Sequence, residues 1–242
     1  MFTIAVTPHA PYSTSTKLYK HCTDIAKLER LNLSTHIAET REEIEFLKYG
    51  TGKFTELLNI LDIPLDTWTP PRVTPIKYLK KEGVLDIQPL LAHCNYLTND
   101  DVDILAKSGS SVAFCPRSHK YFHHTNHPIA RLISAGVNVS IGTDSLASNH
   151  SLSMLDELKF LANNYEELSS ETLISLLTIN GAKSLKLKGI GKLEKNWQAD
   201  LSVVGIPDDQ RPVFEQVCDQ NSENLMTIVA GTICYKHKTI KI

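Results

Sequence analysis

Short apolar runs alternate with longer amphipathic stretches over about the first 150 residues, and this alternation constrains the fold more than any other feature. The runs occupy residues 2–8, 31–39, 89–95, 111–116 and 137–145. A strand, a helix and a further strand in succession imply parallel strands joined by crossover helices. Because the runs lack strict polar alternation, they suit strands that are buried on both faces. The sequence therefore predicts an α/β fold with a parallel sheet.

Several of the intervening stretches carry helix boundary signals. Thr98 opens residues 98–109 as a capping residue, and Gly109 ends them. Residues 127–136 end at Gly136, and Ser169 marks the start of a later helix. We therefore expect helices between the predicted strands and again after residue 150.

The C-terminal part has a different pattern. Residues 199–205 and 225–242 are rich in β-forming residues, and a polar segment that contains two prolines separates them. We expect an α/β body over 1–190 and a small β-rich segment over 191–242. The lysine-rich end, residues 236–242, predicts a solvated edge strand, since lysines commonly guard such edges.

Composition excludes several classes of protein. The 242 residues have a formal net charge of -2 and a pI near 6.5, which argues against a general nucleic-acid binder. No apolar run approaches the ~18 residues of a membrane span, and the N-terminus lacks the pattern of a signal peptide. The five cysteines are scattered without a CxxC pair, which predicts reduced thiols in a cytoplasmic protein.

Polar side chains gather at the C-terminal ends of the predicted strands. In parallel α/β folds the loops at this end build the functional site. Five consecutive strands with a polar residue at this end are hard to obtain from packing alone. These residues are His9, His36, Glu39, His93, Arg117, His119 and Asp144.

Each of these residues also has a purely structural interpretation. A single histidine at a strand end is commonly a hydrogen-bonded structural residue. Asp144 could cap the helix that follows it, and Glu39 could favour the dipole of a helix. Arg117 could be an ordinary surface charge. The joint pattern nevertheless favours a functional site over these separate explanations.

Two imidazoles and a carboxylate suit a divalent metal. His36, His93 and Asp144 match the ligand preferences of zinc or iron. A catalytic zinc has about three protein ligands and an open position for water, whose pKa falls to ~7. Glu39 follows His36 by three residues and would move protons beside that water.

An ordered set of short motifs resembles the amidohydrolase superfamily. The motifs are PHAPYS, HIAET, AHC, CPRS and GTDS, and they come in that order. The resemblance covers residues 3–205, including INGAKSLKL and GKLEKNWQADLSVV near its end. It is closest to the chlorohydrolase-like and adenosine-type deaminases. That branch includes methylthioadenosine/S-adenosylhomocysteine, guanine and aminodeoxyfutalosine deaminases and triazine hydrolases.

The resemblance implies a role for each motif residue. His36 resembles a metal ligand, and His93 resembles the histidine that binds metal or orients the attacking water. Asp144 resembles the aspartate that binds metal and accepts the proton of the water. Glu39 resembles the glutamate that protonates the ring nitrogen.

The substrate contacts that the resemblance implies come from three further motifs. His9 resembles a substrate-contacting histidine, and Ser145 follows Asp144 in GTDS. Arg117, Ser118 and His119 stand where the family usually has a Pro-x-Ser-Asn segment. This departure suggests a variant of substrate specificity that is most similar to aminodeoxyfutalosine-type deaminases.

The resemblance also implies a particular fold. The five predicted strands correspond to strands four to eight of a TIM (β/α)8 barrel, and residues 191–242 correspond to a remnant of a small β-sandwich domain. The HxH pair that supplies two metal ligands in the family is absent from this sequence. We therefore expect an incomplete barrel that resembles the later part of a longer amidohydrolase. We also expect marginal stability, or a homo-oligomer or other association that covers the open barrel edges.

Three functions compete. The first is a metal-dependent hydrolase of a carbon–nitrogen bond other than a peptide bond, a deaminase of a purine nucleoside-like small molecule. The second is a non-catalytic remnant or binding module that keeps the pocket without the full chemistry. The third is a hydrolase of a cyclic amide or triazine. About one zinc or iron per chain would favour the first over the second.

Overall fold

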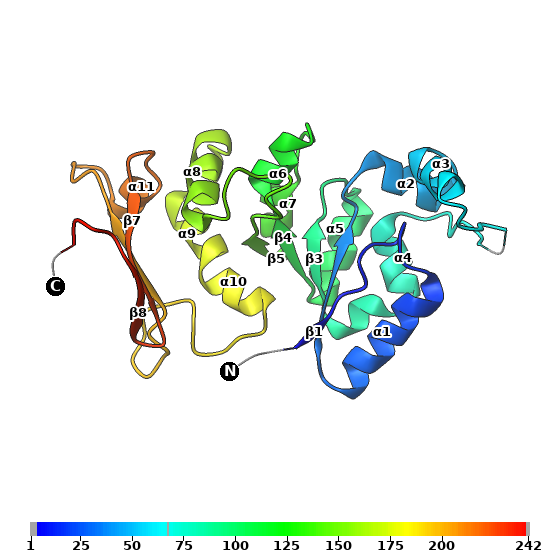
Figure 1. Ribbon diagram of the computed structural model, residues 1–242, viewed down its shortest axis with the longest axis horizontal. Helices are drawn as coiled ribbons and strands as arrows, with labels where there is room; N and C mark the ends of the chain where they lie inside the picture. The colour runs from blue at the N-terminus through cyan, green and yellow to red at the C-terminus, as the bar shows by residue number, and fades with distance from the viewer. Residues whose placement is uncertain (1–3, 67, 241–242) are drawn as a thin grey trace. The chain divides into compact units, whose positions relative to one another are not determined.

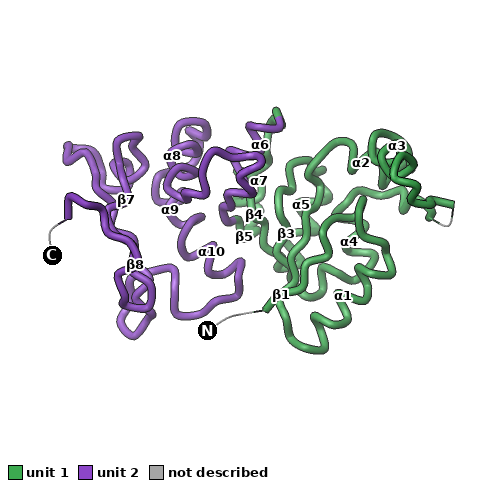
Figure 2. Tube along the Cα trace, in the orientation of Figure 1, with its two compact units in different colours: residues 1–114, 123–139 green, residues 115–122, 140–242 purple. Residues whose placement is uncertain are grey.

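The chain forms two compact units, which Figure 2 draws in different colours. The computed structural model describes residues 4–66 and 68–240. The first unit comprises Met1–Phe114 and His123–Val139, and the second comprises Cys115–Phe122 and Ser140–Ile242. The sequence analysis divided the chain at residue 190 into an α/β body and a small β-rich segment. That division stays a prediction.

A five-stranded sheet has the order β1-β2-β3-β4-β5, which is also the order along the chain (Figure 1). The pairs β1–β2, β2–β3 and β3–β4 are parallel, with Ala5 opposite Asn32 and His36 opposite Ala92. This arrangement confirms the parallel sheet that the alternation predicted. The strands are β1 (Ala5–Val6), β2 (Asn32–Ile37), β3 (Leu90–His93), β4 (Ser111–Phe114) and β5 (Asn138–Ile141).

Helices connect successive strands, as crossover connections between parallel strands require. Those of the first unit are α1 (Thr16–Leu28), α2 (Arg41–Tyr49), α3 (Lys53–Ile60), α4 (Pro75–Lys81), the one-turn 3-10 helix η1 (Val84–Ile87), α5 (Asn99–Ser108) and α7 (Ile129–Ser134). The short α6 (Pro116–Tyr121) belongs to the second unit.

Local capping explains where these helices begin and end. Thr98 and Asp101 form a capping box at the start of α5, and Gly109 ends it in the left-handed conformation at φ 71°. Gly136, at φ 80°, follows α7, and Ser169 caps the helix that begins at residue 170. The helix boundaries predicted from these residues are confirmed.

The core of the first unit lies between the strands and their helices. Leu33, Leu91 and Val112 come from three adjacent strands, and Leu79 and Leu105 come from α4 and α5; all are almost completely buried. Each such side chain contributes about 1.5–3 kcal/mol relative to exposure. The buried strands hold the loops at their C-terminal ends in fixed positions.

The second unit combines helices with a three-stranded sheet of order β6-β7-β8. Both strand pairs are antiparallel. Its elements after α6 are α8 (Met154–Asn164), α9 (Ser170–Leu177), α10 (Ile179–Ser184), β6 (Leu201–Gly205), α11 (Val213–Val217), β7 (Glu223–Val229) and β8 (Thr232–Lys236). The β-rich C-terminal pattern is thus confirmed, but the edge strand predicted over 236–242 is wrong for residues 237–240, since β8 ends at Lys236 and residues 241–242 lie outside the described part of the chain. The chain turns after Lys236, and the His237 imidazole is 2.8 Å from the Thr239 hydroxyl.

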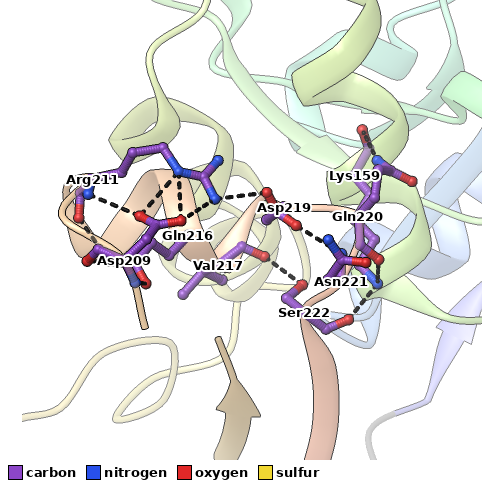
Figure 3. Close-up of polar contacts among 9 residues, drawn as sticks. All are labelled: Lys159, Asp209, Arg211, Gln216, Val217, Asp219, Gln220, Asn221 and Ser222. Carbon is purple, nitrogen blue, oxygen red and sulfur yellow. Dashed lines mark hydrogen bonds and ion pairs between the residues drawn. The ribbon is translucent and has the colours of Figure 1, made fainter. Parts of the chain in front are cut away.

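A polar loop joins β6 to β7 and is tied to α8 (Figure 3). Arg211 bridges Asp209 and Asp219, with guanidinium–carboxylate distances of 2.6 and 2.8 Å. The Lys159 ammonium donates to the carbonyl oxygens of Gln220 and Ser222, at 3.1 and 2.5 Å. These charge-assisted bonds hold the segment between β6 and β7, which includes α11.

Two further findings concern the described part of the chain. None of its helices is both long and apolar enough to cross a membrane. It includes all five cysteines, and no disulfide joins any of them.

Candidate active site

Strained backbone marks the C-terminal ends of three strands. Ala38 follows β2 at φ 51°, His93 and Cys94 end β3 at φ 70° and 55°, and Asp144 follows β5 at φ 57°. Non-glycine residues in this region cost about 1–3 kcal/mol each and cluster at functional sites. The strain therefore falls in the same loops in which the sequence predicted functional side chains.

Three predicted histidines lie together in the first unit. The ring centroids of His9 and His36 are 5.0 Å apart, and those of His36 and His93 are 5.2 Å apart. The His9 pKa is lowered, first by burial and then by the neighbouring His36. The parallel register of β2 and β3 thus brings together side chains that are 57 residues apart in the sequence.

The hydrogen bonds of His36 fix its tautomer. Its Nδ1 lies 3.1 Å from the carbonyl oxygen of His9, which also accepts from the His36 backbone amide at 2.9 Å. Because a carbonyl can only accept, Nδ1 carries the proton, and in the neutral ring Nε2 keeps a lone pair. Metal-ligating histidines are commonly oriented by such a bond from the second ring nitrogen.

Glu39 lies beside this histidine group. Its carboxylate Oε1 is 3.6 Å from His93 Nε2, and both side chains are largely buried. The backbone of His93 is held by His127, whose Nε2 is 2.9 Å from the His93 carbonyl oxygen. A carboxylate beside imidazoles in a partly buried site can accept and return a proton.

Glu43 is a residue of this loop that the sequence analysis missed. It is completely buried, and its two carboxylate oxygens accept from the backbone amides of Ala38 and Glu39, each at 2.9 Å. Burial raises the Glu43 pKa to about 8, although the two amides act to lower it. The signal that could have drawn attention to Glu43 is the T-x-x-E pattern at 40–43, which is typical of a helix start but does not predict these contacts.

We expect Glu43 to make stability depend on pH. Its pKa is raised above the ordinary value of 4.5, so between about pH 4.5 and 8 the folded state holds a proton that the unfolded chain releases. Stability from this group is therefore present below that window and is lost as the pH rises through it. Urea unfolding at pH 5 and pH 9 measures the free energy of unfolding of both proteins. Relative to the wild type, Glu43→Gln should be more stable at pH 9 than at pH 5. Glu45→Gln, which changes an exposed carboxylate of the same helix, should not show this gain.

In the second unit, hydroxyl groups hold the Asp144 carboxylate. Ser118 and Ser148 both donate to its Oδ2, at 2.6 and 2.8 Å. The Asn149 side-chain amide donates to the carbonyl oxygen of Thr143 at 2.7 Å and so anchors the residue before Asp144. The carboxylate is therefore held by two serine hydroxyls, and the residue is not the helix cap considered above, because Ser153 caps α8.

The other predicted contact residues have different surroundings. Arg117 lies near Asp156 and Glu157, at 3.5 and 3.7 Å, and its guanidinium donates to Ser151 at 3.1 Å. His119 is buried on α6, whereas Ser145 is exposed. The Arg117 guanidinium would therefore contact a substrate while it also lies near the Asp156 and Glu157 carboxylates. The substrate contact stays a prediction.

We expect Glu157→Ala to be strongly destabilising. The Glu157 side chain is fully buried, and it accepts from the Arg117 amide at 3.2 Å and from the Asn149 amide at 2.6 Å. Removing one partner of a buried charged pair costs about 3–5 kcal/mol. Asp156→Ala is the matched control, since this half-exposed neighbour should cost about 0–1 kcal/mol. Chemical denaturation would measure both, and equal effects would contradict the expectation.

A metal would find suitable donors in the first unit. His36 offers an oriented Nε2 lone pair, and the His93 ring lies next to it. Within the described residues, no group of three or more His, Cys, Asp or Glu side chains is arranged to hold a metal ion. The donor types fit zinc or iron, and the predicted set of His36, His93 and Asp144 stays a prediction.

Comparison with known proteins gives a consistent result. Residues 1–234 match the amidohydrolase family. A 5-methylthioadenosine/S-adenosylhomocysteine deaminase of Halothermothrix orenii is 33% identical over 206 residues, which are 82% of this chain and 43% of that protein. The homologous enzyme of Pelotomaculum thermopropionicum is 32% identical over 221 residues, 88% of this chain and 45% of that protein. The chain thus spans about half the length of these relatives.

Solved structures show the same relationship. Helicobacter pylori aminofutalosine deaminase superposes with a TM-score of 0.82 and 26% identity, over 96% of this chain and 59% of that one. A zinc-bound adenosine deaminase of Xanthomonas campestris gives a TM-score of 0.78 and 25% identity, over 95% and 51% of the two chains. The five-stranded parallel sheet fits part of the α/β barrel of such proteins.

Proposed function

The chain belongs to the amidohydrolase family, and we propose that it carries the deaminase chemistry of an enzyme that hydrolyses a carbon–nitrogen bond of an adenosine-like substrate. The observation that carries this proposal is the placement of the Glu39 carboxylate 3.6 Å from His93 Nε2, beside the oriented His36 ring. The deaminase names of the relatives support the reaction class.

The proposed metal ligands are His36, His93 and Asp144. Two imidazoles and a carboxylate suit zinc or iron, and such a metal would lower the pKa of a bound water and polarise it for attack. The inclusion of Asp144 rests on residue type and on family membership, since this residue belongs to the second unit. The zinc in the Xanthomonas campestris structure supports a divalent metal in the family.

The chain's own residues would move the protons of the reaction. Asp144 accepts a proton from the attacking water, and His93 orients that water toward the ring carbon that bears the amino group. Glu39 delivers a proton to the adjacent ring nitrogen. Asp144 then passes its proton to the amino group, which leaves as ammonia. Glu39 takes back the proton of the new hydroxyl group, and the oxygen stays on the ring as a carbonyl. Carboxylates and imidazoles are the side chains that commonly carry such proton transfers.

We propose that the substrate is held by His9, Arg117, His119 and Ser145. Of these four residues, His9 belongs to the first unit. Its ring is oriented by the Ser13 hydroxyl, which lies 2.6 Å from His9 Nδ1. The RSHKYFHH segment at 117–124 favours an aminodeoxyfutalosine-like substrate over other adenosine derivatives. The cytoplasmic location expected from the cysteines stays a prediction.

A second candidate function is a small-molecule binding module without turnover. The sequence lacks the HxH pair that supplies two metal ligands in the family, and this feature favours the binding module. Metal analysis distinguishes the two candidates, since about one tightly held zinc or iron per chain supports the deaminase. No retained metal after dialysis supports the binding module.

The proposed function is tested by ammonia release from the purified 242-residue chain supplied with zinc or ferrous iron. The substrates are methylthioadenosine, S-adenosylhomocysteine, aminodeoxyfutalosine and adenosine, with atrazine as the triazine control, for which chloride release is measured instead. Deamination of at least one adenosine derivative is expected. Release of ammonia from none of them by the metal-loaded chain would overturn the proposal.

The proposed assembly is an association that covers the open sheet edges. β1 and β5 are the outer strands of the five-stranded sheet, and an outer strand that lacks a neighbour on one side favours pairing with another chain. Light scattering after size-exclusion chromatography should therefore detect a homo-oligomer. A stable monomer that does not aggregate would contradict this part of the proposal.

A further inference from the structure

The turn between β2 and α2 begins as an ordinary helix start. Residues 40–43 have the T-x-x-E pattern of a capping box, in which the glutamate side chain reaches back to the amide of the capping residue. Thr40 performs its part, since its hydroxyl accepts from the Glu43 amide at 3.1 Å. The distinctive feature is how far back the Glu43 carboxylate reaches.

The Glu43 carboxylate binds the two residues that precede the cap. Oε1 accepts from the Ala38 amide and Oε2 accepts from the Glu39 amide, both at 2.9 Å. Ala38 has φ 51°, so the chain leaves β2 in a conformation that must be held by its surroundings. Each carboxylate oxygen therefore fixes one amide of the turn that carries Glu39.

A second buried side chain holds the other end of the same residue. The Asn95 amide, in the loop after β3, donates to the carbonyl oxygen of Glu39 at 3.0 Å. Asn95 is 3% exposed, and Glu43 is completely buried. Both backbone polar groups of Glu39 are thus bound by buried side chains from two different elements, and its carboxylate lies 3.6 Å from His93 Nε2.

We propose that Glu43 is a positioning residue which, together with Asn95, fixes the Glu39 backbone and so sets where the Glu39 carboxylate lies relative to His93. The inference rests on the proposed function, in which Glu39 moves a proton to the substrate. Proton transfer needs heavy atoms within about 2.6–3.2 Å, and a displacement of about 1 Å can cost 10²-fold in rate.

The test compares Glu43→Gln and Glu43→Ala with Glu42→Gln. Glu42 is the neighbouring carboxylate of α2 and pairs with Lys53 near the surface, so its loss leaves the turn intact. Amide proton shifts are recorded at pH 9, where the Glu43 carboxyl is ionised. The Ala38 and Glu39 amide protons should move upfield in both Glu43 variants and stay in place in Glu42→Gln.

Kinetics supply the second measurement. Glu43→Ala should lower kcat for deamination by about 10–100-fold with little change in KM. Glu43→Gln should lie between Glu43→Ala and the wild type, because glutamine keeps one acceptor oxygen. Glu42→Gln should keep the wild-type kcat.

Two results would overturn the inference. One is unchanged Ala38 and Glu39 amide shifts in Glu43→Gln, and the other is a wild-type kcat in folded Glu43→Ala. If both Glu43 variants fail to fold, Asn95→Ala decides, through the carbonyl carbon shift of Glu39 and a lowered kcat; no change in either would overturn the inference. Should the wild-type chain release no ammonia, the proposed function fails, while the spectra still report whether Glu43 holds the turn. The two failures are therefore distinguishable.

Discussion

Glu39→Gln is expected to lower the rate of deamination by about 10²–10⁴-fold, the usual contribution of a general acid–base group. Glutamine keeps the shape of the side chain but cannot deliver a proton to the ring nitrogen. The backbone contacts to Glu43 and Asn95 do not involve the substituted group, so the fold should be unchanged. Ammonia release under saturating substrate measures the effect.

The control for Glu39→Gln is Glu42→Gln, which removes one negative charge from the same segment but leaves Glu39 in place. The control should keep the wild-type rate and the same thermal midpoint. A near-full rate in Glu39→Gln would show that another group supplies the proton, and the assigned role would be wrong.

His36→Ala is expected to abolish tight metal binding. Loss of a group that merely orients a ligand typically costs 10–100-fold in affinity, so loss of the ligand itself should cost at least ~100-fold. The neighbouring His9 carbonyl oxygen would also lose its ring partner, although the backbone bond between these residues would remain. Zinc or iron content after dialysis, together with competition against a chelator, measures the change.

His21→Ala is the matched control, because this histidine is exposed on α1 of the same unit. Its metal content and affinity should equal those of the wild type. If His36→Ala retained the wild-type metal content, His36 would be a structural histidine, and the metal site would have to be sought elsewhere in the chain.

The positions of the strands and most helix ends follow from local sequence. Thr98 and Gly109 bound α5 through contacts within a few residues, which is why their roles were predictable. The strand expected at the lysine-rich end stops at Lys236, because His237 and Thr239 close a turn there. Lysines typical of an edge strand do not determine where pairing with a neighbouring strand stops.

The candidate site was predictable to the extent that it depends on strand order. His36 and His93 follow adjacent parallel strands, and the C-terminal ends of such strands meet at one edge of the sheet. Arg117 shows the limit of that reasoning. The partner that binds its backbone amide, Glu157, is 40 residues away along the chain, and the sequence pattern around either residue gives no sign of the other.

The parallel α/β pattern and the types of residue at the strand ends could be read from the amino-acid sequence, because they follow from residue chemistry and from periodicities over a few residues. The family could also be read from it, through the resemblance of an ordered set of short motifs. The burial of the Glu43 carboxylate against the Ala38 and Glu39 amides could be found only in the folded chain, as could the bond from Asn95 to the carbonyl oxygen of Glu39. The physical reason is that a buried carboxylate binds whichever donors the folded backbone brings to it, and the left-handed turn at Ala38 sets those donors in place.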